Sequence, residues 1–202
     1  MENEPGILVD LPGFGTSPPP RRPWSTSEYA DVIAPLLSEL ERPRTLIGHS
    51  FGGRVAVHLA VRPGLVDRLV LVGTPLVRDD LKSPKLRYRV LRWAATTGLV
   101  PNSTLERVRR RHGSRDYNSA TGIMRQILVA AVNESYEEQL RRIKCPTVLI
   151  CGEFDTAATP EMTRKAAKLL SDGRVSIVEG TGHLLDEALV SEVRRWMQGV
   201  TE

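Results

Sequence analysis

The sequence predicts an α/β fold with a mostly parallel sheet flanked by helices, because short β-rich runs alternate with helical patterns along the chain. A length of 202 residues and a hydrophobic content of 41% suit one globular domain that buries its own core. The longest apolar runs are strand-sized, far below the ~18 residues of a membrane-spanning helix. The first four residues are acidic and polar, unlike a signal peptide. We therefore expect a cytoplasmic protein without a membrane partner.

The alternation places the strands and helices at definite positions. The strand-sized runs are Ile7–Asp10, Thr45–Gly48, Leu69–Val72, Thr147–Cys151 and Val175–Val178. Helices are expected from Ser25 or Ser27 to about Leu40, over Phe51–Val61, after Pro160 and over Leu184–Met197. From about Pro75 to Arg142 the pattern is helical and irregular, which interrupts the alternation. We therefore expect a core formed by residues 1–74 and 143–202, with residues 75–142 as a helical insertion.

The segment Gly48-His49-Ser50-Phe51-Gly52-Gly53 joins a predicted strand to a predicted helix. A strand that turns abruptly into a helix strains its central residue, and side chains two positions before and after it would collide. Gly48 and Gly52 satisfy that constraint, and Gly53 supports the close turn. The turn exposes the Ser50 hydroxyl over a helix N-terminus, where the Phe51 amide points to the place of a developing oxyanion. Ser50 is therefore the predicted nucleophile, and these residues form a nucleophile elbow.

This elbow and the segments around it resemble the α/β-hydrolase superfamily along almost the entire chain. Asp10 to Ser17 is similar to the family's D-x-P-G-x-G-x-S segment, and Gly180 to His183 is similar to its histidine-bearing loop. The resemblance implies an α/β-hydrolase fold in which residues 75–142 form a helical cap over Ser50. It also implies the chain order Ser, Asp, His for the catalytic residues.

His183 and Asp155 are the predicted partners of Ser50. His183 follows a predicted strand in a Gly-rich loop, where its imidazole can take the serine proton. Asp155 lies just past the strand Thr147–Cys151, where a carboxylate can fix the tautomer of the imidazole. Glu153 is the alternative acid, whereas Asp186 is also placed to cap the last helix and Asp10 is expected to be structural. Among the other histidines, His49 is expected to point away from the nucleophile, His58 to be packed, and His112 to lack an orienting acid.

The beginning of the chain departs from the family pattern. The family usually opens with three strands and an H-G loop that supplies the second oxyanion-hole amide, whereas here the D-x-P-G segment starts nine residues after Met1. We therefore expect an N-terminally truncated chain with Phe51 as its one oxyanion-hole donor. The absent central strand would leave ladder groups unpaired unless Ile7–Asp10 moves over to pair with Thr45–Ile47.

The leading functional hypothesis is a serine hydrolase that acts on an ester or a related acyl substrate through a Ser-His-Asp triad and an acyl-enzyme intermediate. One alternative is a catalytically impaired or non-catalytic fragment or binding protein, which the incomplete oxyanion hole favours. A C–C bond hydrolase and a cofactor-free perhydrolase share the same triad, so both remain alternatives. Substrate identity and oligomeric state stay open.

Charge and cysteine content limit the partners. Residues 78–115 carry 11 Lys/Arg and 3 Asp/Glu, and this excess is expected either to be a solvated face or to favour an anionic small-molecule substrate. The arginines of this segment that are expected to favour such a substrate include Arg87, Arg89, Arg92, Arg109 and Arg110. No nucleic-acid motif, metal-ligand spacing or nucleotide-binding motif is present, so no cofactor and no metal are expected. Cys145 and Cys151 are too few for a disulfide scaffold or a zinc site and are expected to be reduced.

Overall fold

A computed structural model describes residues 6–77 and 120–198 of the chain. Within these ranges the strands form one parallel sheet in the order β1-β2-β3-β4. The strands are β1 (Thr45–His49), β2 (Arg68–Val72), β3 (Thr147–Gly152) and β4 (Gly173–Val178). The predicted α/β class and the predicted parallel sheet are therefore confirmed, and all four strands begin within two residues of the predicted positions.

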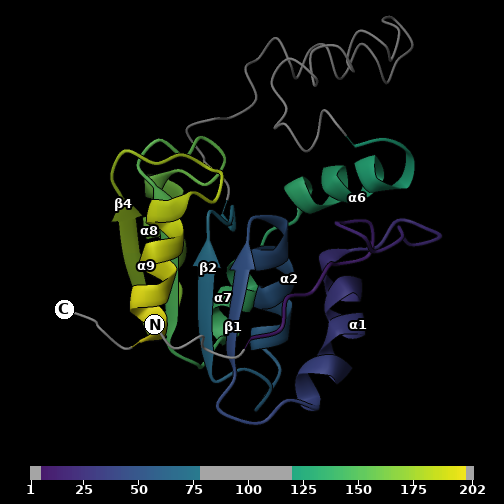
Figure 1. Cartoon of the computed structure of the whole chain (residues 1–202), viewed down its shortest axis with the longest axis horizontal. Helices are drawn as coiled ribbons and strands as arrows, with labels where there is room; N and C mark the ends of the chain where they lie inside the picture. The colour runs from purple at the N-terminus through teal and green to yellow at the C-terminus, as the bar shows by residue number, and fades with distance from the viewer. Residues whose placement is uncertain (1–5, 78–119, 199–202) are drawn as a thin grey trace, which may run out of the picture.

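Helices cover both faces of the sheet (Figure 1). They are α1 (Thr26–Ser38), α2 (Phe51–Ala60), α6 (Gly122–Asn133), α7 (Glu137–Arg142), α8 (Pro160–Ala167) and α9 (Glu187–Met197). Ser25 caps α1, because its side chain accepts from the Glu28 amide while the Glu28 carboxylate accepts from the Ser25 amide. This reciprocal pair of hydrogen bonds shows that Ser25, and not Ser27, is the residue that caps the helix.

Alternate residues of β2 face opposite sides of the sheet, as a strand requires. Leu69 and Leu71 belong to the larger apolar cluster, which includes side chains from α1, α2, α7 and α8. Val70 and Val72 belong to a second cluster with Leu189 of α9. Because both faces are buried, β2 is apolar from Leu69 to its end, which is typical of a central parallel strand.

Residues 7–10 do not form the strand that the sequence predicts. They run as exposed, extended chain, and Leu8 is 96% exposed. They also do not pair with β1, which among the described residues pairs with β2 alone and therefore forms the edge of the sheet. A β-rich run becomes a strand only when a neighbouring edge accepts its ladder hydrogen bonds, and residues 7–10 engage none.

The predicted insertion is described only at its two ends. Its central part, residues 78–119, lies outside the described residues, and so do the five arginines expected to contact an anionic substrate. Tyr136, Leu140 and Ile143 in and around α7 are fully buried in the larger apolar cluster. The division into a core and a cap stays a prediction.

Candidate active site

The chain makes an abrupt turn at Ser50, between β1 and α2. Ser50 has φ 48° and ψ −109°, and it is the one non-glycine residue with positive φ in the described part of the chain. Its amide donates to the carbonyl of Val72 at the end of β2, with 3.0 Å between nitrogen and oxygen. The surrounding structure must hold a residue whose backbone is strained in this way, and such residues are common at catalytic positions. The predicted nucleophile therefore occupies the tip of a sharp strand-to-helix turn.

Close packing at the turn explains two of its three glycines. A Cβ on Gly48 would lie 2.6 Å from the Gly53 Cα, and a Cβ on Gly53 would lie 2.0 Å from the Thr74 hydroxyl oxygen. The predicted collision at Gly52 is wrong, because a Cβ there would have no described atom within 4 Å. Gly53 is the crowded residue instead, because the first turn of α2 places it against Gly48 of β1 and against Thr74, which follows β2.

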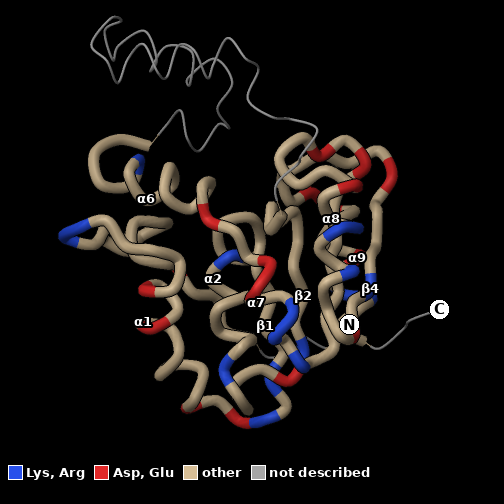
Figure 2. Tube along the Cα trace, turned by 180° about the vertical axis from the view of Figure 1, so that it is seen from behind, with Lys and Arg blue, Asp and Glu red and all other residues tan. Residues whose placement is uncertain are grey.

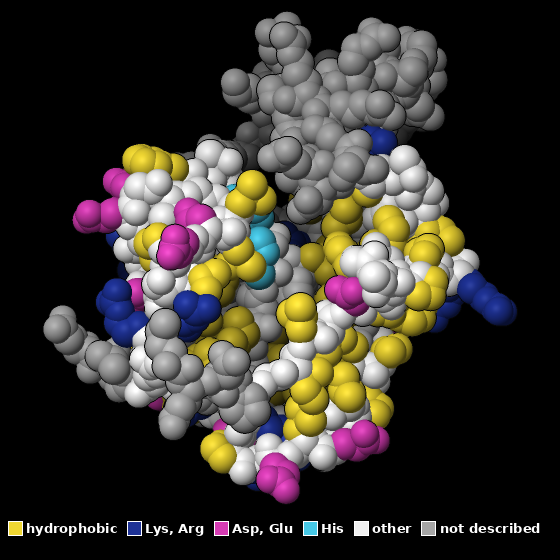
Figure 3. All heavy atoms as spheres, viewed as in Figure 1, with side chains coloured by type: hydrophobic (Ala, Val, Ile, Leu, Met, Phe, Trp, Pro, Cys, Tyr) yellow, Lys and Arg dark blue, Asp and Glu magenta, His cyan; other side chains and the backbone are white. Residues whose placement is uncertain are grey.

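The structure brings the three predicted catalytic residues together. The Ser50 Oγ lies 3.1 Å from His183 Nε2, and His183 Nδ1 lies 2.8 Å from Asp155 Oδ2. A carboxylate only accepts, so Nδ1 carries the proton in this bond and Nε2 of the neutral ring is left to accept from the serine hydroxyl. The Asp155 side chain is fully buried, whereas the His183 side chain is 20% exposed. In Figure 3, histidine atoms are visible in the wall of a hollow on the surface.

Asp155 is held in place by the turn that follows β3. Its Oδ1 accepts hydrogen bonds from the amides of Ala157 and Ala158, both at 2.8 Å. Gly73 at the end of β2 lets the carboxylate and the imidazole approach, because a Cβ there would lie 3.1 Å from Asp155 Oδ2 and 3.3 Å from His183 Nδ1. This buried carboxylate therefore has its hydrogen bonds satisfied, and one of its oxygens faces the imidazole.

The alternative acids have other partners. Glu153 is exposed and accepts from the Gly180 amide at 3.0 Å, so it holds the backbone of the histidine loop rather than the imidazole. Asp186 caps α9 by accepting from the Leu189 amide. Asp10 accepts from the amide and the hydroxyl of Thr16, and these bonds lower the pKa of its carboxyl. Among these acids, Asp155 contacts the His183 ring.

The loop that carries His183 packs tightly on the end of β3. The Phe154 amide donates to the Thr181 carbonyl at 2.9 Å. A Cβ on Gly152 would lie 2.4 Å from the Gly182 carbonyl oxygen, so the glycine lets the two backbones touch. His183 is therefore placed by backbone contacts between two loops, and it lies 28 residues from Asp155 in the sequence.

His49 contacts the same loop, which the sequence did not indicate. Its Nε2 lies 2.9 Å from the carbonyl oxygen of His183, and the two imidazole rings are 5.3 Å apart at an interplanar angle of 40°. The ring of His49 therefore contacts the backbone of the predicted base. The elbow motif carries no signal for this contact, because it depends on a loop 134 residues later.

Aromatic rings pack beside the nucleophile. Phe51 lies 5.0 Å from the Phe14 ring and 5.1 Å from the Tyr29 ring. The Tyr29 hydroxyl donates to the Pro12 carbonyl at 2.9 Å, and burial raises the pKa of Tyr29 to about 12. The segment from Asp10 to Ser17 is thereby fixed against the start of α2. Phe51 is the first residue of that helix, so its amide is one of those without an intrahelical acceptor.

A second polar cluster lies away from the nucleophile, where α1, α2 and the segment between α6 and α7 meet. The Thr26 hydroxyl contacts His58 Nε2 at 3.0 Å, the Tyr136 hydroxyl at 3.2 Å and the Glu134 carboxylate. Tyr136 also donates to Glu134 at 2.5 Å. Burial lowers the pKa of His58, which is consistent with the predicted packed role. His112 lies outside the described residues.

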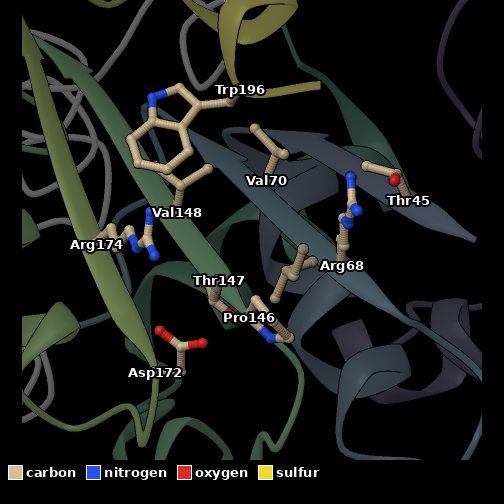
Figure 4. A pocket seen from close by; sticks show the side chains of 10 residues that line it. Thr45, Arg68, Val70, Pro146, Thr147, Val148, Asp172, Arg174 and Trp196 are labelled. Carbon is tan, nitrogen blue, oxygen red and sulfur yellow. The ribbon is translucent and has the colours of Figure 1, made fainter. Parts of the chain in front are cut away.

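The remaining sites in the described ranges are apart from the catalytic residues. A cavity of about 250 Å³ lies at the amino ends of the strands, lined by residues from all four strands and by Trp196 of α9 (Figure 4). Ser50, Asp155 and His183 follow the opposite, carboxyl ends. Both cysteines are free thiols, and burial raises their pKa values. Within residues 6–77 and 120–198, no three His, Cys, Asp or Glu side chains gather as metal ligands.

Charge is also distributed unevenly over the described chain. Acidic residues gather in the loops at the carboxyl ends of β3 and β4, and basic residues gather near the opposite ends of β1 and β2 (Figure 2). Across the same described residues, no helix has both the length and the apolar character to span a membrane.

Comparison with known proteins gives one short match and one over most of the chain. An uncharacterized protein of Mycobacterium tuberculosis is 46% identical over 77 residues, which are 37% of this chain and 23% of that protein. A 2-(acetamidomethylene)succinate hydrolase of Mesorhizobium japonicum is 28% identical over 203 residues, covering 90% of this chain and 72% of that protein. This chain therefore spans less than a quarter of the first relative and most of the second.

A solved structure and a family model complete the comparison. An esterase from Thermogutta terrifontis with malate bound has the same fold, with a TM-score of 0.63, 22% identity, and coverage of 95% of this chain and 79% of that one. The model of the alpha/beta hydrolase family matches residues 3–192. With the fold, the elbow turn and this match in agreement, the chain belongs to the α/β-hydrolase family.

Proposed function

We propose that this protein is a serine hydrolase that cleaves an ester or a related acyl substrate through an acyl-enzyme intermediate. The observation that carries the proposal is the pair of hydrogen bonds from Ser50 to His183 and from His183 to Asp155, at 3.1 and 2.8 Å. Nucleophile and base lie within hydrogen-bond reach, and a third group orients the base, which is the arrangement that covalent acyl transfer needs.

In the proposed mechanism each group has its own step. The Ser50 Oγ attacks the acyl carbon while its proton moves to His183 Nε2, and Asp155 stabilises the resulting imidazolium. The Phe51 amide donates to the oxyanion at the start of α2. When the tetrahedral intermediate collapses, the bond to the leaving group breaks and His183 returns its proton to that group. Water then attacks the acyl-enzyme with His183 as the base, and the acid product leaves Ser50 free.

The strained turn supports this proposal over a binding role. A serine held at positive φ costs about 1–3 kcal/mol, and the strained turn holds its hydroxyl within hydrogen-bond distance of His183. The Mesorhizobium relative is also named a hydrolase. A cytoplasmic location belongs to the same proposal and is supported by two free thiols.

Hydrolysis of p-nitrophenyl acetate by wild type and by Ser50→Ala tests the proposal. We expect kcat to fall by about 10⁴ to 10⁶ in the variant, because nucleophile and base act as one unit. Thermal melting of both proteins is the control for folding. If Ser50→Ala hydrolyses the ester as fast as wild type, the proposed nucleophile is wrong and the non-catalytic alternative takes its place.

Substrate charge is a finer part of the proposal. The basic segment favours an anionic acyl substrate, and the name of the Mesorhizobium relative includes a succinate. We expect kcat/KM for an anionic ester to fall more steeply with salt than that for a neutral ester of equal length. Equal salt dependence of the two esters would remove this preference and leave the serine mechanism in place.

A further inference from the structure

The imidazole of His49 connects the nucleophile elbow to the backbone of the catalytic base. Its Nε2 lies 2.9 Å from the carbonyl oxygen of His183. We propose that His49 is a positioning residue that fixes the distance between Ser50 and His183, an inference that rests on the proposed serine mechanism. His49 does not contact the reacting atoms in this role, because it acts on the backbone of the base.

The chemistry of the contact sets the direction of the hydrogen bond. A backbone carbonyl only accepts, so His49 Nε2 must carry a proton and donate it. This requirement selects the Nε2–H tautomer for His49, the opposite of the Nδ1–H tautomer that Asp155 selects for His183. The two rings are also in contact, with centroids 5.3 Å apart and an interplanar angle of 40°, so a ring–ring contact accompanies the hydrogen bond.

The contact closes a ring of bonds around the catalytic pair. His49 and Ser50 are neighbours in the chain, and each side chain contacts the same residue, His183, one at its carbonyl and one at its ring. The position of the base relative to the nucleophile is thereby fixed through its backbone and its side chain together. Such closed arrangements hold reacting groups near their productive geometry before substrate binds.

The histidine loop is also held from the side of β3. Glu153 accepts from the Gly180 amide, and the Phe154 amide donates to the Thr181 carbonyl. Those contacts fix the loop relative to the strand that carries Asp155, two strands away from the elbow. His49 adds a contact from β1, the strand that carries Ser50. The loop is therefore held from both strands whose ends supply its catalytic partners.

Two substitutions separate the donor from the shape of the ring. His49→Phe keeps a ring and removes the donor, whereas the amide of His49→Gln extends far enough to keep an N–H near the position of Nε2. For p-nitrophenyl acetate we expect His49→Phe to lower kcat by about tenfold to a hundredfold at nearly unchanged KM. We expect His49→Gln to recover kcat to within about threefold of wild type, since it restores the hydrogen bond.

The outcomes distinguish this inference from the function on which it rests. An active wild type with an equally active His49→Phe overturns the positioning role alone, and so does a His49→Gln that is as slow as His49→Phe. An inactive wild type overturns the serine mechanism and the positioning role together. Slow turnover in His49→Phe with recovery in His49→Gln supports both.

A spectroscopic measurement on the wild-type protein does not depend on the activity of any variant. Long-range ¹H–¹⁵N spectra of the imidazoles report which ring nitrogen carries the proton, and the signals of His49 are those that His49→Gln lacks. We expect the Nε2–H tautomer for neutral His49. An Nδ1–H tautomer would contradict the hydrogen bond to the His183 carbonyl and overturn the inference, whatever the activity.

Discussion

Two clusters in this molecule combine the same chemical groups, a hydroxyl, an imidazole and a carboxylate, with different consequences. In the catalytic cluster the imidazole of His183 stands between the Ser50 hydroxyl and the Asp155 carboxylate. In the second cluster the Thr26 hydroxyl stands between the imidazole of His58 and the Glu134 carboxylate. The order of contacts, rather than the kinds of residue, separates the two.

The order decides what each imidazole can do. An imidazole between hydroxyl and carboxylate can take the hydroxyl proton while the carboxylate stabilises the charge that forms. In the second cluster the Glu134 carboxylate accepts from the Thr26 hydroxyl, and within residues 6–77 and 120–198 no carboxylate forms a hydrogen bond with the His58 ring as Asp155 does with His183. Burial also lowers the pKa of His58, which disfavours that cation further.

Access differs as well. The His183 side chain is 20% exposed on loops that follow the carboxyl ends of the strands. Thr26 is fully buried in the first turn of α1 and contacts α2 and the segment between α6 and α7. The hydroxyl of the second cluster is therefore out of reach of a substrate, although His58 and Glu134 beside it are only half-buried. We therefore propose that the first cluster serves catalysis and the second stability, and the predictions below test that division and the packing of the turn that carries Ser50.

The largest expected effect is that of Asp155→Asn. The amide would no longer hold the Nδ1–H tautomer of His183, so we expect kcat for p-nitrophenyl acetate to fall by about 10⁴. The matched control is Glu134→Gln, which neutralises the acid of the second cluster and is expected to leave kcat unchanged. If the two variants lose activity equally, the two clusters are not functionally distinct.

The next effect concerns the backbone of the elbow. In Gly48→Ala the new Cβ would meet backbone atoms of Gly53, so we expect a loss of about 1–3 kcal/mol in the free energy of unfolding. Gly52→Ala is the control, because its Cβ would meet no described atom and Ala favours the helix by about 0.8–1 kcal/mol. Urea denaturation measures both. A Gly52→Ala that is less stable than Gly48→Ala would contradict the packing described for this turn.

The third effect separates stability from catalysis in the second cluster. Thr26→Val keeps the shape of the side chain and removes the hydroxyl that contacts His58, Glu134 and Tyr136. We expect the free energy of unfolding to drop by about 1–3 kcal/mol, because buried polar partners lose a hydrogen bond, while kcat stays unchanged. A changed kcat at unchanged stability would reverse the roles that we assign to the clusters.

The smallest effect is a pH dependence of stability. The pKa of His58 is lowered in the folded protein, first by burial and further by the charge of Arg62, whereas the charges of Glu134 and Asp31 raise it in part. Above a pH of about 6.5 the ring is neutral in both states, and below it the unfolded chain binds a proton that the folded protein resists. Stability should therefore fall as pH falls below that value, by at most about 1.4 kcal/mol per pH unit. His58→Gln should flatten this slope, and an unchanged slope would assign it to other groups.

The sequence predicted those parts of the molecule that depend on local pattern. Alternating strands and helices, the turn at Ser50 and the loops of Asp155 and His183 each carry a signal within a few residues, and the structure has them at those places. Ile7–Asp10 was predicted wrongly, because an apolar run reports β propensity but not whether a partner edge accepts it.

The features that the sequence did not predict depend on distant contacts. His49 meets a carbonyl 134 residues later, and Thr26 meets Glu134 across 108 residues. Gly52 was expected to be crowded because it belongs to the motif, yet the close contact in three dimensions falls on Gly53. Motif spacing reports which backbone turn forms, whereas the packing around that turn is set by segments far away in the chain.

The most direct test of the central claim is the intact mass of the folded protein after reaction with a fluorophosphonate, with Ser50→Ala alongside. Our account predicts one covalent adduct on wild type and none on the variant, because only a serine activated by His183 attacks the phosphorus. An unlabelled wild type, or equal labelling of the variant, would contradict the assignment of Ser50, His183 and Asp155 as a working triad.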